Sequence, residues 1–151
     1  MSMVFLAQFL LSFFASFSFG IIFNIPRRHL AASGITGALG WVMYYFLSQT
    51  IGIEPLISNF VAAITMTSTA IFFTKRLQAP LIVFVTCGLI PLVPGGKAYE
   101  SVRAVVENDN LAALDSGFQA ALIALSIAMG IIITEMMYEL FNIIKRKVSN
   151  R

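Results

Sequence analysis

The first 26 residues carry no charged side chain, and residues 3–25 form an apolar run longer than the roughly 20 residues that an α-helix needs to span a bilayer. The bias extends along the chain, because 58% of its 151 residues are hydrophobic, only 11% are charged and the mean hydropathy is +0.87. Ordinary soluble domains contain roughly 45–50% apolar and 25% charged residues. The sequence therefore predicts an all-α, polytopic integral membrane protein.

The first apolar run has neither a basic amino-terminal region nor a small-residue cleavage site, so we expect a retained span and not a signal peptide. The five expected spans are residues 3–25, 30–50, 57–73, 80–96 and 118–144. The fourth is short, since its uninterrupted part has only about 14 residues. Residues 97–117 continue it as an outer connection with a short helix. We expect one transmembrane domain over residues 1–151.

The charge distribution tests this count. If the amino terminus lies outside, the first and third connections and the carboxyl-terminal tail face the cytoplasm. They hold eight of the ten basic residues: Arg27, Arg28, Lys75, Arg76, Lys145, Arg146, Lys147 and Arg151. Short cytoplasmic loops are enriched in Lys and Arg, so five crossings with the amino end out and the carboxyl end in fit the sequence best. A re-entrant fourth segment would weaken this asymmetry.

Two prolines and two glycines interrupt the fourth segment. Pro91 and Pro94 lack an N–H and leave helical carbonyls without their usual partners, while Gly95 and Gly96 permit backbone angles that other residues avoid. A helix restarting near Lys97 would direct free amides and its positive end into the break, where they would suit a carboxylate. Lys97 and the Tyr99 hydroxyl would add a charge and a donor. The alternative is an ordinary turn at the outer surface.

The third segment carries a second set of polar residues: Asn59, Thr65, Thr67, Ser68, Thr69 and Thr74. Thr65, Ser68 and Thr69 are spaced to share one helix face, and their hydroxyls are candidates for binding a polar solute. Alternatively, they bond to backbone carbonyls or to neighbouring helices. Glu135 in the last span is a candidate for accepting a coupling proton, or else an interfacial acid.

Small residues predict where helices approach closely. Gly34, Gly37 and Gly40 recur every three residues in the second span. In the last span, the corresponding stripe would be Ala120, Ala124 and Ala128. We expect both stripes to face other helices.

Other function classes lack support. The pI of about 9.3 reflects charges at helix ends, so no nucleic-acid partner is expected. Cys87 and His29 are the single cysteine and histidine, and no metal or cofactor motif is present. An intramembrane enzyme would need a second catalytic group at depth, whereas Glu135 and Glu139 lie near the cytoplasmic end. We therefore do not expect an enzyme.

Four motifs follow one another along the chain. They are Asn24-Ile25-Pro26-Arg27-Arg28-His29-Leu30, the glycines at 34, 37 and 40, Gln78-Ala79-Pro80, and Ile90-Pro91-Leu92-Val93-Pro94-Gly95-Gly96-Lys97-Ala98-Tyr99. Together they resemble the threonine/serine exporter family, specifically its small five-span component. The resemblance covers residues 5–138. Its motif residues here are Asn24, Pro26, Pro80, Pro91, Pro94, Gly95 and Tyr99.

The resemblance implies a multi-pass protein of the cell (inner or plasma) membrane that lacks half of an exporter. The expected partners are a larger membrane subunit of the same family, a small carboxylate substrate and the bilayer, with a homo-oligomer left open. Export of threonine and serine driven by the proton gradient is the implied function. Two alternatives stay open: dicarboxylate export of the succinate type with the larger subunit, and a non-transporting assembly partner.

Overall fold

A computed structural model describes residues 2–149, and all regular elements in this range are helical. The elements are α1 (Ser2–Ile22), α2 (Arg27–Tyr45), the π-helical η1 (Phe46–Ile51), α3 (Pro55–Leu77), α4 (Leu81–Leu89), the 3₁₀-helical η2 (Ile90–Leu92), α5 (Gly95–Val106) and α6 (Asn110–Ser149). The predicted all-α fold is confirmed. The last helix begins earlier than the expected residue 118.

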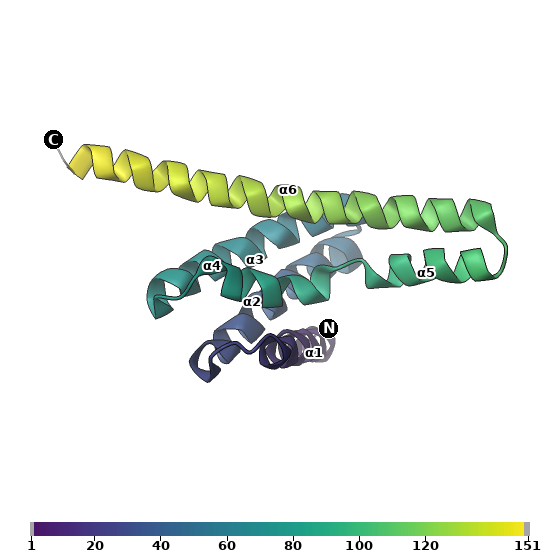
Figure 1. Cartoon of the computed structure of the whole chain (residues 1–151), viewed down its shortest axis with the longest axis horizontal. Coiled ribbons are helices and arrows are strands. Elements are labelled where there is room, and N and C mark those ends of the chain that lie inside the picture. Colours follow the sequence, from purple (N-terminus) through teal and green to yellow (C-terminus); the bar gives the residue numbers. More distant parts are fainter. Residues whose placement is uncertain (1, 150–151) are drawn as a thin grey trace.

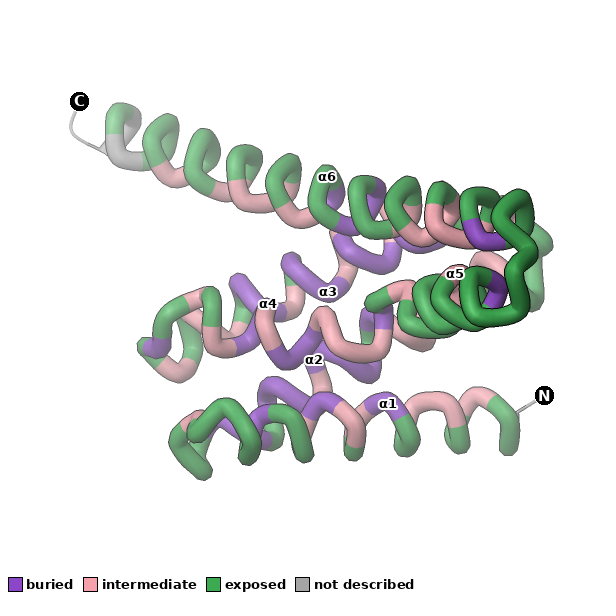
Figure 2. The backbone as a smooth tube through the Cα atoms, turned by 45° about the vertical axis from the view of Figure 1, so that its right-hand side comes forward, coloured by how far each residue is buried: buried purple, intermediate pink, exposed green. Residues whose placement is uncertain are grey.

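Helix α2 is the centre of the bundle and packs against α1, α3 and α4. Helix α5 and the first part of α6 form an antiparallel hairpin, and α6 then continues along α3. Helix α5 reaches past α2 and α3 in Figure 1. The buried residues gather in α2, α3 and α4, whereas the outer face of α6 is exposed (Figure 2). Exposed apolar side chains on such a face are expected where lipid or another membrane subunit covers it.

Within the described residues, four helices are long and apolar enough to cross a membrane: Met3–Ile22, Arg27–Ile51, Pro55–Leu77 and Asn110–Lys145. A fifth crossing would consist of Leu81–Leu92 together with Gly95–Val106, whose axes differ by 53°. The chain thus bends at the break without reversing its direction. Helix α6 has 40 residues, about 60 Å at 1.5 Å per residue, and is therefore about twice as long as a ~30 Å hydrocarbon core is thick.

The turns explain several residues that punctuate the sequence. Asn24 has a left-handed backbone with φ 56°; its N–H donates to Ile21 O, and the Ile25 N–H donates to Gly20 O. This pair of bonds is a Schellman motif, in which Asn tolerates the left-handed position better than branched residues do. Asn108 ends α5 in the same way. Pro55 begins α3 at its first turn, where the missing N–H costs nothing.

The basic segments gather at one end of the molecule. The α1–α2 connection with Arg27 and Arg28, the α3–α4 connection after Lys75 and Arg76, and the end of α6 all lie there (Figure 1). The α5–α6 turn lies toward the opposite end. Segments far apart in sequence therefore share one positively charged end, as an interfacial anchor requires.

Glycines allow close contact along α2. A methyl group added at Gly34 would lie 2.6 Å from the Phe13 ring, and one added at Gly40 would lie 2.9 Å from Met66 Cβ. At Gly37 an added methyl group would overlap Ser16 on α1 and lie 3.4 Å from Gly88 Cα on α4. We call Gly34, Gly37, Gly40 and Gly88 the glycine seam. Small residues thus bring α1, α3 and α4 against α2.

The alanine stripe predicted for the last span does not pack closely, because Ala124 and Ala128 are exposed and line a cavity of about 170 Å³ with Leu89, Val93 and Pro94. Helix α6 instead packs on α3 through Ser126, Ile127 and Gly130. A methyl group added at Gly130 would lie 2.8 Å from Ala63 Cβ. Alanine spacing alone does not show which side of an apolar helix meets a neighbour, since apolar residues surround α6 on all sides.

Candidate functional site

The break between α4 and α5 is a defined turn. Pro91 has no N–H to donate to the Cys87 carbonyl. The Ile90 N–H donates to this carbonyl instead, so the Cys87 carbonyl has a hydrogen-bond partner. Pro94 has φ −74° and ψ 52°, and the Gly95 N–H donates to Val93 O over 2.7 Å. These values describe an inverse γ-turn centred on Pro94. The turn separates η2 from α5.

Two amides at the start of α5 remain free. The first intrahelical bond runs from Ala98 N–H to Pro94 O over 3.0 Å. The Gly95 N–H is taken by the γ-turn, which leaves the N–H groups of Gly96 and Lys97 without a backbone acceptor in the part of the chain that the structure describes. Free amides and the positive helix end favour a nearby anion.

The two glycines of the break differ from the expectation. Neither Gly95 nor Gly96 has a positive φ; Gly52 is the one glycine with a positive φ among residues 2–149. A methyl group added at either position would meet nothing within 4 Å. The backbone therefore does not require glycine at positions 95 and 96, and the space beside them is open.

This open space is part of a pocket of about 250 Å³ that brings four helical segments together. Its lining comprises Trp41 and Tyr44 of α2, Pro55 and Asn59 of α3, residues 91–97 of the break, and Ile123 of α6. We call it the break pocket. Five of the predicted site residues thus lie at one cavity: Pro91, Pro94, Gly95, Gly96 and Lys97.

Polar groups of the break pocket come from three elements. Asn59 is only 4% exposed, and its amide Nδ2 donates to Pro55 O over 2.8 Å, which leaves Oδ1 as an acceptor. Trp41 Nε1 donates to Gln8 Oε1 over 2.7 Å and is held in place by α1. Lys97 Nζ forms a 2.8 Å ion pair with Glu100, and its side chain is 40% exposed. The lysine charge is therefore partly compensated within α5.

The other predicted site residues lie outside this pocket. Tyr99 is 68% exposed on α5. Thr65 and Thr69 donate their hydroxyl protons to the carbonyls of Val61 and Thr65, at 3.0 and 2.8 Å, as the alternative interpretation of these hydroxyls expected. Ser68 is exposed. The hydroxyls of α3 therefore do not converge on the break.

Glu135 is half-buried on α6, twelve residues beyond Ile123. That spacing corresponds to about 18 Å along a helix, so its carboxylate is remote from the break pocket. It lies one turn before Tyr138, whose ring faces Lys75 Nζ at 4.5 Å. Glu135 is thus near the basic end of the bundle.

Sequence reasoning missed Trp41 and Tyr44. They lie one turn apart near the end of α2, with ring centroids separated by 5.2 Å. Aromatic residues at the end of a span are the usual sign of a membrane interface, and this pattern was available in the sequence. Only the packing of α2 against η2 shows that the two rings line the break.

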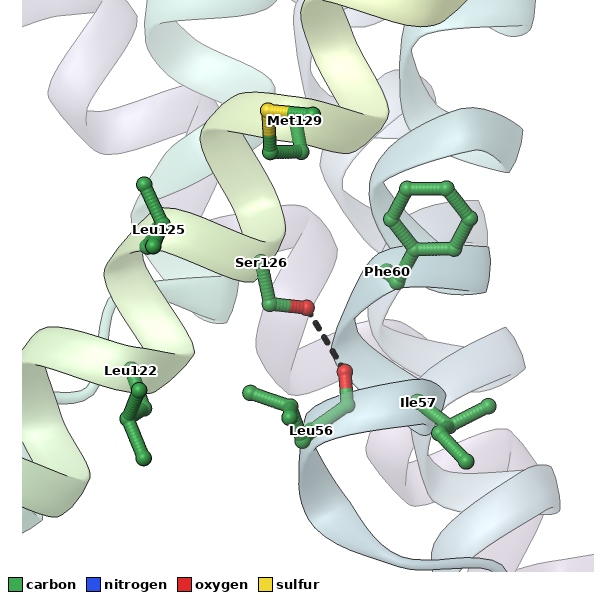
Figure 3. Close-up of a pocket in the computed structure, with 7 residues that line it drawn as sticks. All are labelled: Leu56, Ile57, Phe60, Leu122, Leu125, Ser126 and Met129. Atoms are coloured by element: carbon green, nitrogen blue, oxygen red, sulfur yellow. Dashed lines mark hydrogen bonds between the residues drawn. The ribbon is translucent and has the colours of Figure 1, made fainter.

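A second cavity of about 300 Å³ lies at the crossing of α3 and α6 (Figure 3). Its lining is apolar except for Ser126, whose hydroxyl donates to Leu56 O over 2.6 Å. The one polar side chain is therefore already used to join the two helices. Because it offers no free polar group, this cavity is a poor site for a charged solute.

Membrane-spanning helices with one broken segment beside a small pocket are typical of membrane transport proteins. Residues 8–137 match the family described as "Threonine/Serine exporter, ThrE", and the chain belongs to this family. The resemblance seen in the motifs is confirmed. The family is one of exporters, which is not an enzyme class, and the protein is a multi-pass protein of the cell membrane.

The "Probable threonine/serine exporter" of Mycobacterium tuberculosis (strain ATCC 25618 / H37Rv) is 29% identical to the chain over 111 residues. The match covers 73% of this chain and 21% of that protein. The chain therefore spans about a fifth of the length of this relative. No solved structure matches the chain.

Proposed function

We propose that this chain is one subunit of a two-component secondary exporter of small carboxylate solutes, with threonine or serine as substrate and the proton gradient as energy source. The observation that carries the proposal is the meeting of the broken fourth segment with Asn59 and Tyr44 in the break pocket. Family membership and the name of the mycobacterial relative support the substrate class.

The substrate carboxylate would be held by the free amides of Gly96 and Lys97, assisted by the positive end of α5. The Asn59 Oδ1 atom would accept a hydrogen bond from the substrate ammonium or hydroxyl group. A cavity of about 250 Å³ is smaller than the ~300–1,000 Å³ of pockets for drug-sized ligands, and so suits a small solute. Thr65, Ser68 and Thr69 have no direct role in this arrangement.

A larger subunit would complete the exporter. The α5–α6 hairpin exposes apolar side chains on a segment that also carries ion pairs, as is expected of a surface that another membrane subunit covers. These side chains include Val102, Val105, Val106, Leu111 and Leu114. We propose five crossings with the amino end out, forming a single transmembrane domain that pairs with an inverted counterpart in the larger subunit.

Transport by the pair tests the proposal directly. The chain and its larger subunit are reconstituted in vesicles, and efflux of labelled threonine, serine and succinate is measured with and without a proton gradient. Threonine and serine efflux that needs both subunits is expected. Succinate efflux alone would favour the dicarboxylate alternative, and full activity of the larger subunit alone would leave this chain as an assembly partner.

Two variants locate the substrate site. Gly95→Leu should abolish export without affecting membrane insertion, because the added side chain enters open space at the pocket. Asn59→Leu should lower export at least about tenfold, since loss of a buried hydrogen bond to a charged group costs roughly 1.5–3 kcal/mol. Ile82→Leu, at an exposed residue of α4 outside the break pocket, is the control. Normal export by Gly95→Leu would reject this site.

Proton coupling is tested separately at Glu135. Glu135→Gln keeps the size of the side chain and removes its charge. We expect exchange of labelled threonine to persist while efflux driven by the proton gradient is lost. Full gradient-driven export by this variant would remove Glu135 from the mechanism and leave the substrate site untouched.

A further inference from the structure

A cavity of about 560 Å³, more than twice the volume of the break pocket at about 250 Å³, lies where α1 ends and α2 begins. It is lined by Phe17, Ile21, Asn24, Ile25, Arg27 and Leu30, which are far from the break in sequence. We call it the α1–α2 cavity. The α1–α2 connection beside it lies at the end of the molecule that gathers the basic segments (Figure 1).

The polarity of the α1–α2 cavity changes along its length. Phe17, Ile21 and Leu30 lie within the two apolar helices, whereas Asn24 and Arg27 lie at the connection between them. The cavity therefore has an apolar part at the depth of the spans and a polar, positively charged part at the helix ends. A phospholipid has the same order of groups, with acyl chains below and a phosphate at the interface.

The polar part of the cavity is free to bind. Its lining includes no acidic residue, and among residues 2–149 no carboxylate forms an ion pair with Arg27. The backbone around Asn24 is satisfied by the Schellman bonds, so the side-chain amide is not needed to cap α1. Guanidinium groups bind phosphate through charge-assisted hydrogen bonds, often two at once.

We propose that the α1–α2 cavity binds one anionic phospholipid, with the phosphate at Arg27 and Asn24 and an acyl chain along Phe17, Ile21 and Leu30. The site is separate from the break pocket and does not depend on the proposed transport function. Bound lipid would tie the α1–α2 connection to the membrane surface at the basic end.

Native mass spectrometry of the full chain in detergent tests charge recognition. Phosphatidylglycerol and phosphatidylcholine with identical acyl chains are titrated against the wild type, Arg27→Gln and Arg76→Gln. Arg76 is exposed at the same end but lies outside the cavity. We expect one phosphatidylglycerol bound with at least tenfold preference, about a tenfold loss for Arg27→Gln and less than a twofold change for Arg76→Gln. Equal losses for both variants would overturn the proposal.

A second pair of variants tests whether the cavity itself is used. Ile21 lines the cavity and is 55% exposed, while its neighbour Ile22 is 67% exposed and does not line it. Ile21→Trp should fill the apolar part and weaken phosphatidylglycerol binding at least fivefold, and Ile22→Trp should leave it unchanged. Identical binding by these variants would show that lipid attaches only to surface charge. Displacement of the lipid by millimolar inorganic phosphate alone would show a free-anion site, and either result would overturn the proposal.

Discussion

Two groups of glycines in this molecule have opposite surroundings. In the glycine seam, a methyl group added at Gly37 would collide with Ser16 and approach Gly88, so the neighbouring helices occupy all the space. At the break, a methyl group added at Gly95 or Gly96 meets nothing within 4 Å. The seam thus holds the bundle together, whereas the break borders the pocket that we assign to the substrate. Whether a glycine in a membrane helix marks close packing or open space therefore depends on the side chains that surround it.

The largest effect is expected in the seam. Gly37→Leu should lower the free energy of unfolding by about 3 kcal/mol, because overpacking a dense core forces helices apart. Thermal unfolding in detergent, followed by the fraction that remains monodisperse, measures this loss. The matched variant Gly96→Leu should unfold like the wild type. If both variants are equally stable, the seam does not pack as described.

The α1–α2 connection adds a third case. At Asn24 the backbone angle, and not the available space, limits which residues fit. Asn24→Val should destabilise the protein by about 1–2 kcal/mol, because a branched residue is strained at φ 56°. Asn24→Gly removes the same amide without that strain and should be nearly neutral. The midpoints of thermal unfolding of the two variants are compared. A destabilised glycine variant would mean that the amide itself, and not the backbone, holds this turn.

The break should tolerate a small side chain. Gly95→Ala is expected to raise the free energy of unfolding by up to about 1 kcal/mol, since the backbone is already helical and alanine loses less entropy than glycine. Thermal unfolding measures the change, with Gly34→Ala as the contrasting seam variant. Destabilisation by Gly95→Ala would show that the break is more tightly packed than the open space indicates.

The smallest effect is expected at the hydroxyls of α3. Thr65→Val removes a bond to the backbone carbonyl of Val61 and should change stability by less than about 0.6 kcal/mol. Export by the reconstituted pair should be unchanged, in contrast to Asn59→Leu. A strong transport defect in Thr65→Val would return the α3 hydroxyls to the substrate site.

Much of the architecture follows from local sequence. Uncharged runs longer than a bilayer span predict membrane helices, and Pro26, Pro55 and Pro80 mark where helices begin. A short helix was expected within residues 97–117, and α5 spans Gly95–Val106. These features depend on residues close together in the chain, so no knowledge of packing is needed.

The candidate site was only partly predictable. Residues 91–97 were singled out by their prolines and glycines, and they do line one pocket. Trp41, Tyr44 and Asn59 join them only because α2 and α3 lie against η2. Thr65 and Thr69 donate their hydroxyl protons to carbonyls of their own helix and do not line the break pocket. Periodicity identifies a helix face but not what that face meets.

By itself, the sequence determined the membrane setting, the helical class, the family and the position of the break, since hydropathy, missing N–H groups and motif order are properties of the chain alone. The tertiary structure decided which glycines are crowded, which side of α6 is buried and which polar groups share a pocket with the break. The reason is physical. In an apolar chain every helix face is suited to burial. Contacts between segments distant in sequence decide which face is buried.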